Sequence, residues 1–506
     1  MSIWPQLSNS GLHEECGIFA IYGHKEAAAL TALGLHALQH RGQEATGIVS
    51  LDRGKFYQYR NQGRVADNFS DENVIAKLPG DAALGHNRYA TTGETSLHNV
   101  QPLFAEFTFG GVALAHNGNL TNFAELRTEL QRRGALFQST SDTEIILHLM
   151  ALAKDVRGAD GIITRLSDAL QQIEGAWSLA MLSSQGLMGI RDPHGIRPLI
   201  LGQLDEAWIL SSETCALDIV GAKFVREIAP GEMVVINQQG VSSRRVLPAE
   251  SQRFCIFEKV YFARPDSIMS GGSAYQSRKR IGQELAREAG VHADCVIPVP
   301  DSGVPAALGY AEQSGIKFEM GIIRNHYVGR TFIEPTDGIR HLGVRLKHNA
   351  NPDVIRGKNV VLVDDSIVRG TTMTKIVEMV RNAGAKSVHL RIASPAILFP
   401  CFYGVDTPDK NGLLAAQYHL DLVAMAKFLA CDSLAYISIE GLHKAVGAMQ
   451  AADGSDHING GYCDACFTGN YPHLEKKACN PTEHMSDIFR ANDVSQSLSK
   501  TQNIIA

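Results

Sequence analysis

Length, composition and charge exclude several classes of protein. With 506 residues, 44% of them hydrophobic, the chain has a globular composition and is long enough for two or three domains. A net charge of −6 argues against a general nucleic-acid binder, and no apolar run reaches membrane-spanning length. Residues 1–15 lack the features of a secretory signal, so we expect the nine cysteines to be cytoplasmic thiols or metal ligands.

The first half of the chain has the pattern of a mixed α and β domain. A strand is predicted to begin at Cys16, and a helix to follow over about 26–40. A second, amphipathic helix is predicted over 122–133. Short apolar runs between 177 and 236 are separated by Gly, Pro and Asp, which indicates the strands of mixed sheets. The polar segment 238–245 is predicted to lead into a linker.

Cys16 could be structural or nucleophilic. A lone cysteine is most often a small buried hydrophobe. A nucleophilic thiol needs a base and an oxyanion hole. If residues 1–15 were removed, Cys16 would carry its own α-amino group, whose unperturbed pKa of about 8 suits a general base. The chain also offers groups suited to a carboxylate, an ammonium and a developing oxyanion: Arg88, Asp142, Asn117 and Gly118.

Five motifs in this order resemble the N-terminal-nucleophile glutamine amidotransferases. They are Cys16-Gly-Ile, His40-Arg-Gly-Gln-Glu, His86-Asn-Arg88-Tyr-Ala-Thr, His116-Asn117-Gly118-Asn and Ser141-Asp142-Thr-Glu. The resemblance implies an αββα glutaminase domain over 16–248, in which Cys16 attacks the glutamine amide. It also implies an oxyanion hole from Asn117 and Gly118, a carboxylate site at Arg88, and an amino-group site at Asp142 and Gly118. Residues 1–15 would be a propeptide removed by self-cleavage.

A buried strand and a phosphate-binding loop are predicted around Asp364. The run Val360 to Val363 is aliphatic and β-branched, as in a strand buried on both faces, and helical spacing begins at Met373. Ligands bind beyond the carboxyl ends of such strands, and amides at a helix N-terminus favour phosphate. Asp364 and Asp365 suit ribose hydroxyls or a hydrated Mg²⁺. The alternative is a buried strand that ends in a solvated acidic turn.

Two further segments of the second half suggest binding of a polyanion. The strand from Asp294 runs into a loop whose amides and hydroxyl could hold a pyrophosphate, Pro300-Asp301-Ser302-Gly303. The basic segment from Arg324 to Lys347 is either a solvated surface loop or a lid that closes over a polyanion. We favour the lid, because the segment lies between the two phosphate-binding elements.

Residues 360–372 resemble the phosphoribosyl-pyrophosphate (PRPP) signature of type I phosphoribosyltransferases. This resemblance implies an α/β domain with a parallel sheet over 249–470, followed by a C-terminal tail, 471–506. It implies ribose contacts from the two acids and a 5-phosphate site formed by Ser366, Ile367, Val368, Arg369, Gly370, Thr371 and Thr372. It further implies a pyrophosphate loop at Pro300, Asp301, Ser302 and Gly303, and one Mg²⁺ per subunit held by Ser302, Asp364 and Asp365.

The motif Cys463-Asp-Ala-Cys466 has several readings taken alone. It could be a redox pair, half of a zinc site or part of an iron–sulfur site. Its place in a Gly-rich loop after the α/β domain disfavours a thioredoxin-like pair, and no second CxxC completes a zinc ribbon. With Cys255 and Cys401, the motif is similar to the four ligand positions of the iron–sulfur branch of these amidotransferases. The resemblance therefore implies one [4Fe–4S] cluster per subunit that links the two domains.

The order of the motifs is that of the glutamine amidotransferases that end in a phosphoribosyltransferase. The resemblance implies that glutamine, PRPP and water give 5-phospho-β-D-ribosylamine, glutamate and pyrophosphate, the first committed step of purine synthesis. Ammonia would pass from one site to the other. The resemblance also implies purine nucleotide inhibitors and a homotetramer or homodimer, without nucleic-acid or membrane partners. Many relatives read Lys-Asn-Arg-Tyr where this chain reads Arg324-Asn325-His326-Tyr327, so the inhibition pattern is left open.

Two other functions compete with this one. A different amidotransferase, such as an asparagine or glucosamine-phosphate synthase, would not use PRPP, and the signature around Asp364 and Asp365 argues against it. A non-catalytic PRPP-sensing regulator would not need the glutaminase residues and would need a DNA-binding segment, which the sequence does not show.

Overall fold

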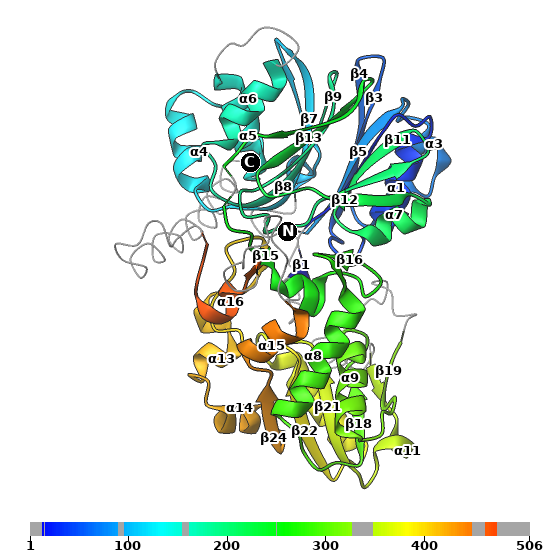
Figure 1. Ribbon diagram of the computed structural model, residues 1–506, viewed down its shortest axis with the longest axis vertical. Helices are drawn as coiled ribbons and strands as arrows, with labels where there is room; N and C mark the ends of the chain where they lie inside the picture. Colours follow the sequence, from blue (N-terminus) through cyan, green and yellow to red (C-terminus); the bar gives the residue numbers. More distant parts are fainter. Residues whose placement is uncertain are drawn as a thin grey trace, which may run out of the picture.

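The computed structural model of the chain describes residues 13–14, 16–89, 96–153, 161–248, 250–325, 348–447 and 461–472. These residues form two lobes (Figure 1). Most of the predicted propeptide, nearly all of the predicted lid and most of the C-terminal tail lie outside the described residues. Within the described ranges, no helix has the length and apolar character needed to cross a membrane.

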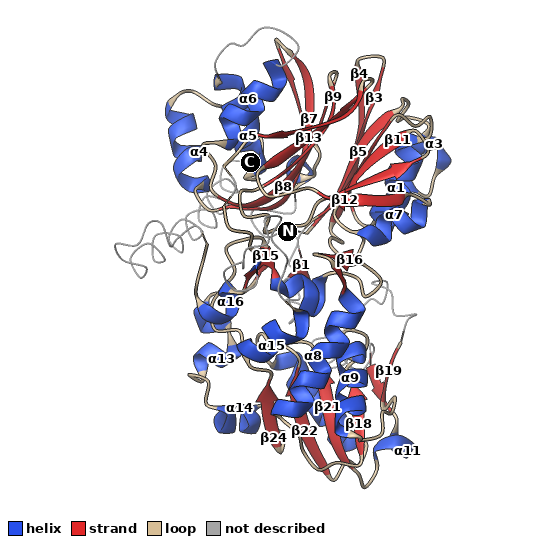
Figure 2. Cartoon of the chain, viewed as in Figure 1, coloured by secondary structure: helices blue, strands red, loops and turns tan. Residues whose placement is uncertain are grey.

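The first lobe is a sandwich of two antiparallel sheets (Figure 2). The seven-stranded sheet has the order β12-β10-β11-β2-β5-β3-β4, and the six-stranded sheet the order β14-β13-β9-β8-β7-β6. The strands of the first sheet are β2 (Gly17–Tyr22), β3 (Ala45–Asp52), β4 (Lys55–Gln62), β5 (Ala82–Arg88), β10 (Ile200–Leu204), β11 (Ala207–Ser211) and β12 (Lys223–Glu227). Those of the second are β6 (Leu103–Phe107), β7 (Gly110–Leu120), β8 (Gly175–Ser183), β9 (Gly186–Arg191), β13 (Glu232–Asn237) and β14 (Gly240–Arg245).

Helices cover the outer face of each sheet (Figure 1). Apolar side chains of α1 (Ala27–Ala37) and α7 (Thr214–Val220) pack on the seven-stranded sheet. Those of α5 (Thr143–Leu152) and α6 (Gly161–Leu170) pack on the six-stranded sheet, beside α4 (Phe123–Arg132). Aliphatic side chains fill the space between the sheets, with alanines such as Ala20, Ala113 and Ala180 among leucines, isoleucines and valines. The predicted αββα fold is confirmed, and the two helices predicted over 26–40 and 122–133 are α1 and α4. Three short helices complete the lobe: α2 (Val65–Phe69), α3 (Glu72–Ile75) and η1 (Leu97–Asn99).

The second lobe contains a four-stranded parallel sheet of order β18-β21-β22-β24. Val361 and Val363 of β21 face one apolar core, and Val360 and Leu362 face the other, so the predicted doubly buried strand is confirmed. Helices α8 and α9 contribute to the first core, and α12 and α14 to the second. The elements are β18 (Cys295–Pro298), β21 (Asn359–Asp364), β22 (Ser387–Ile392), β24 (Ser433–Tyr436), α8 (Ala274–Glu288), α9 (Val304–Ser314), α12 (Thr371–Asn382) and α14 (Leu422–Phe428).

Short elements join and surround the lobes. Three pairs of short strands are antiparallel: β1 (His13–Glu14) with β23 (Val405–Asp406), β16 (Ile268–Met269) with β17 (Gly272–Ser273), and β19 (Ile322–Arg324) with β20 (His348–Ala350). A fourth pair is parallel: β15 (Phe254–Cys255) with β25 (Tyr462–Cys463). The short helices are η2 (Glu258–Phe262), α11 (Pro352–Ile355), η4 (Lys410–Gly412), α13 (Leu414–Gln417), α15 (Ile439–Val446) and α16 (Ala465–Thr468).

A buried ionic network connects the lobes. Arg41, which follows α1, donates hydrogen bonds to Glu213 at the start of α7 and to Glu258 at the start of η2, where the second distance is 2.8 Å. All three side chains are fully buried. Glu213 also accepts a hydrogen bond of 2.6 Å from the Ser267 hydroxyl. The network therefore joins the outer helices of the first lobe to the segment that enters the second.

The first prediction removes one charge from this network. Burial raises the pKa of Glu213, but His40 and Arg41 lower it more, so the pKa lies well below its ordinary value. Glu213→Gln leaves Arg41 without one of its buried partners, which typically costs about 3–5 kcal/mol. We expect urea to unfold the variant at a clearly lower concentration at pH 7.

The pH dependence provides the check on this prediction. A carboxylate whose pKa is depressed by folding stabilises above its unfolded-state pKa of about 4.5, and the stabilisation is lost as pH falls toward the folded-state pKa. The gap between wild type and Glu213→Gln should therefore be constant from pH 7 to pH 5 and narrow below pH 4.5. Glu129→Gln, at an exposed pair with Arg133, is the control and should change little. A pH-independent gap would contradict the assignment of the effect to charge.

Candidate functional site

Cys16 lies immediately before β2, an inner strand of the seven-stranded sheet, at the level where this strand begins. It is 8% exposed, and its carbonyl oxygen accepts a 3.3 Å hydrogen bond from the Arg41 guanidinium. Gly17 pairs with Asn87 in the β2–β5 ladder, so the same antiparallel register sets Cys16 opposite Arg88. The backbone of Cys16 has φ = 71°, a left-handed conformation that strains a residue with a Cβ. The strain is located beside the peptide bond to residue 15.

The end of β7 carries the two predicted oxyanion donors. Asn117 is fully buried, and its Oδ1 accepts a 3.4 Å hydrogen bond from Arg197 Nε. Among the described residues, its Nδ2 has no hydrogen-bond partner. Buried amide donors are rarely left unpaired, because the lost hydration is not replaced. This amide is therefore available to an oxygen atom of a bound molecule.

Only glycine fits at position 118 of β7. Its φ is +141°, and a Cβ there would lie 2.0 Å from the carbonyl oxygen of Ala176 on the paired strand β8. No side chain can be accommodated at that distance. The glycine predicted from the His-Asn-Gly-Asn motif therefore has a steric reason in the fold.

Arg88 and Asn117 are brought to one end of the sandwich by a histidine. His86, two residues before Arg88, forms a 3.0 Å hydrogen bond with the carbonyl of His116, the residue before Asn117. Strands β2 and β5 also pack across the sandwich against β7. Burial lowers the pKa of His86 to about 3, so this ring is neutral. The structure thus places three predicted site residues at adjoining strand ends: Cys16, Arg88 and Asn117.

Asp142, which precedes α5, is the fourth predicted residue of this site. It is 7% exposed, and its Oδ2 accepts a 3.0 Å hydrogen bond from the Leu120 amide at the end of β7. Burial raises the pKa of Asp142, but His116 and the hydrogen bonds to Leu120 and Thr143 lower it more. The side chain is therefore a buried carboxylate close to the oxyanion donors, which suits an ammonium group.

The residues that support this site were not singled out by sequence reasoning. Arg41 stands in the quoted His-Arg-Gly-Gln-Glu motif but received no role, and it holds the Cys16 carbonyl. Arg197, which orients Asn117, lies in a loop with no motif around it. Glu213 and Glu258, which bind Arg41, are distant in sequence and give no local signal.

The predicted PRPP residues gather at the carboxyl ends of β18 and β21. The Ser302 hydroxyl donates a 3.4 Å hydrogen bond to Asp364 Oδ1, and Asp365 is also buried. Burial and the neighbouring Asp365 raise the pKa of Asp364 well above its ordinary value. A cation, or hydroxyl groups that donate hydrogen bonds, would relieve this repulsion.

Two glycines allow the phosphate loops to form. A Cβ at Gly303 would lie 2.5 Å from the carbonyl oxygen of Val363, so only glycine fits where the 300–303 loop crosses β21. Gly370 has φ = +77° and turns the 366–372 loop into the first turn of α12. The amides at that helix N-terminus suit a phosphate. Arg324 of β19 forms an ion pair with Asp301 in the first loop.

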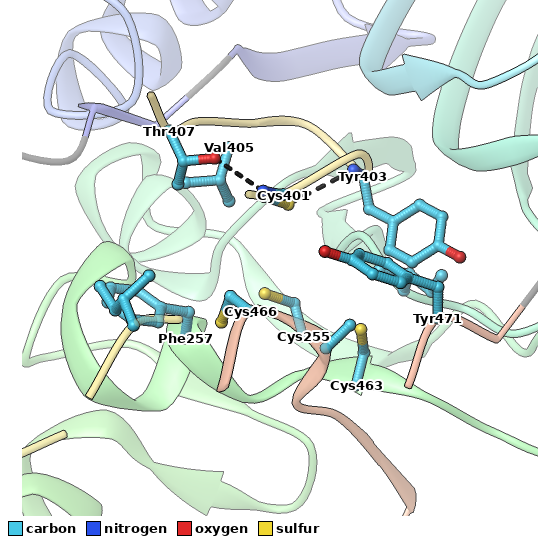
Figure 3. A pocket seen from close by; sticks show the side chains of 12 residues that line it. Cys255, Phe257, Cys401, Tyr403, Val405, Thr407, Cys463, Cys466 and Tyr471 are labelled. Carbon is cyan, nitrogen blue, oxygen red and sulfur yellow. Dashed lines mark hydrogen bonds between the residues drawn. The ribbon is translucent and has the colours of Figure 1, made fainter. Parts of the chain in front are cut away.

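The four predicted cluster cysteines line one apolar pocket (Figure 3). Cys255 and Cys463 are paired in the β15–β25 ladder, and Cys401 faces the other three across the pocket. Shortly before Cys401, the backbone amides of Leu398 and Phe399 each donate a 3.1 Å hydrogen bond to the carbonyl oxygen of Cys466. Tyr471, whose ring packs against Phe402 and Tyr403, closes one side.

The donor set of this pocket fits a cluster better than a single ion. In the described ranges, no group of three or more His, Cys, Asp or Glu side chains is arranged to hold one metal ion. Four cysteines around an apolar cavity instead form a donor set that would fit an iron–sulfur cluster, which is larger than one ion. Burial raises the pKa of Cys255 to about 12, so this thiol is neutral at neutral pH, and a metal bound here would have to replace its proton.

Comparison with known proteins identifies the family. Models of a glutamine amidotransferase domain and of a phosphoribosyl transferase domain match residues 86–218 and 266–393. The chain is 55% identical to the amidophosphoribosyltransferase of Rhizobium etli over 92% of this chain and 93% of that protein. The chain belongs to the amidophosphoribosyltransferase family. It is therefore an enzyme of the first step of purine biosynthesis, and the function predicted from the sequence is confirmed.

Two solved structures extend the likeness to three dimensions. One, described as the allosteric regulatory enzyme of purine biosynthesis, superposes with a TM-score of 0.85 at 43% identity, over 90% of this chain and 96% of that one. The other is the glutamine PRPP amidotransferase of B. subtilis complexed with ADP and GMP. It gives a TM-score of 0.84 at 43% identity, over 90% of this chain and 97% of that one. Both lobes of the chain thus have the fold of this family.

The second prediction tests the unpaired amide of Asn117. Asn117→Ala removes one predicted oxyanion donor, and loss of such a donor typically lowers kcat by about 10²–10³. We expect this decrease in glutamine-dependent synthesis, with a smaller change in KM for glutamine. Synthesis from ammonia should stay within about twofold of wild type, because the second lobe is unchanged. Equal loss of both activities would show that Asn117 acts on the fold instead of the oxyanion.

Proposed function

We propose that residues 16–248 form the glutaminase and 249–470 the phosphoribosyltransferase, and that ammonia passes between them. The observation that carries the glutaminase assignment is the unpaired buried amide of Asn117, next to Gly118 and at the same end of the sandwich as Cys16. Arg88 would bind the glutamine carboxylate, and Asp142 with the Gly118 backbone would bind its amino group.

The glutaminase steps follow from these positions. The α-amino group of Cys16 takes the thiol proton, and the thiolate sulfur attacks the amide carbon of glutamine. Asn117 Nδ2 and the Gly118 amide hold the resulting oxyanion. The C–N bond then breaks, and the α-amino group returns the proton to the departing nitrogen as ammonia is released. Water hydrolyses the thioester to glutamate and restores the thiol.

The transferase steps are assigned to the second lobe. Asp364 and Asp365 would contact the ribose hydroxyls, the 366–372 loop the 5-phosphate, and the 300–303 loop the pyrophosphate. One Mg²⁺ held by Ser302, Asp364 and Asp365 would neutralise charge on the pyrophosphate as it leaves. This assignment is supported by the buried, mutually repelling acids. Ammonia attacks the anomeric carbon, and enclosure from water keeps it unprotonated.

We also propose that residues 1–15 are a propeptide. A free α-amino group on Cys16 requires cleavage before that residue. Two features support a defined position for the segment: the strained backbone of Cys16, and the pairing of His13–Glu14 with Val405–Asp406. Strain beside the peptide bond would favour its cleavage, since the bond's loss releases the constraint on Cys16.

The remaining proposals concern ligands, assembly and location. Cys255, Cys401, Cys463 and Cys466 would hold one [4Fe–4S] cluster per subunit, which links β15, β25 and the 398–407 loop. A cytoplasmic location is supported by the absence of disulfides among the eight described cysteines. Purine nucleotides are proposed as inhibitors, since the B. subtilis relative was solved with ADP and GMP. Assembly as a homotetramer or homodimer stays a prediction.

The third prediction separates the two half-reactions. Cys16→Ala should abolish glutamine use and leave synthesis from high ammonia largely intact, because the transferase residues are in the other lobe. Asp365→Asn should weaken synthesis from both nitrogen sources, because both use PRPP. Intact mass shows which residue begins the active wild-type chain, and full glutamine-dependent activity in a chain that retains residues 1–15 would overturn the propeptide. Loss of ammonia-dependent synthesis in Cys16→Ala would overturn the division of roles.

The fourth prediction tests the cluster ligands. Cys401→Ser, expressed without oxygen, should lose most of its bound iron and labile sulfide and give little soluble protein, because cluster binding is coupled to folding. Cys431→Ser is the matched control, since Cys431 is buried in a different core and is not among the pocket-lining residues. It should retain wild-type iron. Wild-type iron content and thermal stability in Cys401→Ser would rule the ligand set out.

A further inference from the structure

Asn119 connects the two lobes by a side-chain hydrogen bond. It follows Gly118 on β7, and its Nδ2 donates a 3.0 Å hydrogen bond to the carbonyl oxygen of Phe402. Phe402 belongs to the second lobe, and it is the residue directly after Cys401. A single side chain thus spans from the oxyanion strand to the loop that carries one of the four pocket cysteines.

The loop that accepts this bond is held by the pocket. The Cys401 amide donates a 2.6 Å hydrogen bond to Thr407 Oγ1, and the Tyr403 amide donates to Cys401 Sγ at 3.3 Å. The Phe402 ring packs against Tyr471, which lines the pocket, with 4.9 Å between ring centroids. The position of the Phe402 carbonyl therefore depends on the order of the pocket around Cys401.

The strand that donates the bond has little freedom to move without moving the site. In the β7–β8 ladder, Asn117 pairs with Ser178, Gly118 with Trp177 and Asn119 with Ala176. The two strands also approach closely at Gly175, where a Cβ would lie 2.3 Å from the Asn119 carbonyl oxygen. A shift of Asn119 along or across the ladder is therefore passed to the two residues before it, which are the oxyanion donors.

We propose that Asn119 is a positioning residue: its hydrogen bond to Phe402 fixes the oxyanion end of β7 against the 401–403 loop, and so couples the glutaminase site to the cysteine-lined pocket. The inference rests on the proposed role of Asn117 and Gly118. An oxyanion hole acts on the transition state, so a misplaced hole lowers kcat and leaves KM for glutamine nearly unchanged. Asn119 itself need not touch glutamine.

The experiment compares Asn119→Ala with Asn122→Ala in the full-length enzyme. Asn122 is also half-buried, and its amide makes two hydrogen bonds, to Gln172 and Glu174, within the first lobe alone. We expect Asn119→Ala to lower kcat for glutamine hydrolysis about tenfold, part of the 10²–10³ typical for deletion of an oxyanion donor. KM for glutamine and ammonia-dependent synthesis should stay within about twofold, and Asn122→Ala should change neither rate by more than that.

Two further variants separate the hydrogen bond from general packing. Asn119→Asp has nearly the same shape but cannot donate, so it should be at least as slow as Asn119→Ala. Asn119→Gln retains an amide donor and should recover part of the lost kcat. If Asn119→Asp kept the wild-type kcat, or if Asn122→Ala lost as much as Asn119→Ala, the positioning role would be overturned.

A readout outside catalysis tests the coupling from the other direction. Because the hydrogen bond from Asn119 also restrains the Phe402 carbonyl, its loss should loosen the 401–403 loop, and iron should pass to a chelator several-fold faster from Asn119→Ala than from wild type or Asn122→Ala. Equal iron-loss rates would refute the link to the pocket. If wild-type protein contained no iron, the proposed cluster would be overturned, but the positioning role of Asn119 would not. That role would still be decided by the separate effects on kcat and KM and by the reactivity of Cys401 toward a thiol reagent.

Discussion

The fully buried guanidinium of Arg41 is the constraint on which the arrangement of the two lobes depends. It binds the Cys16 carbonyl, Glu213 and Glu258 together. Buried charges are costly to dehydrate, and mutual attraction offsets the cost only while all partners stay in place. The ends of α1, α7 and η2 therefore cannot separate without leaving an unpaired charge. Cys16, the predicted nucleophile, is fixed relative to the second lobe by Arg41, the same residue that joins the two lobes.

A second connection between the lobes lies at the end of β7. Where Arg41 holds the main chain of Cys16, Asn119 ties the oxyanion strand to the 401–403 loop. Cys16 and the end of β7 are thus attached to the other lobe through separate contacts. Ammonia must travel between the lobes without meeting solvent, because a protonated nitrogen is no nucleophile. Two attachments restrict relative rotation of the lobes more than one can, which favours a continuous enclosed route.

Much of this architecture could be predicted from local sequence, and the limits of prediction have a physical cause. The strand from Val360 to Val363 is contiguous, so composition was enough to predict it, whereas the role of the loop after it came from family resemblance. The helix predicted over 122–133 is α4 to within one residue at each end, because its apolar period is local. The Arg41 network was not predictable, since its partners stand 172 and 217 residues away and no periodic pattern relates them.

The pocket cysteines show the same limit. The CxxC motif identified two of the four cysteines, but it did not decide between a redox pair, a zinc site and an iron–sulfur site. Cys255 and Cys401 came from family resemblance, since isolated cysteines in unlike surroundings carry no spacing signal. The pairing of Cys255 with Cys463 depends on a short parallel ladder between distant segments, which local propensity cannot specify.

The glutaminase site is also where the fold departs from local rules. Cys16 holds a left-handed backbone despite its side chain, and Asn117 keeps a buried amide without a partner in the described protein. Each feature costs stability and would be removed by relaxation of the chain. The ladder between β7 and β8, the steric fit at Gly118 and the contacts from Arg41 and Arg197 prevent that relaxation. Sites at which a fold holds unfavourable local geometry are those prepared for a ligand that makes it favourable. Here that ligand would be the oxyanion formed when the glutamine amide is attacked, which would accept a hydrogen bond from the unpaired amide of Asn117.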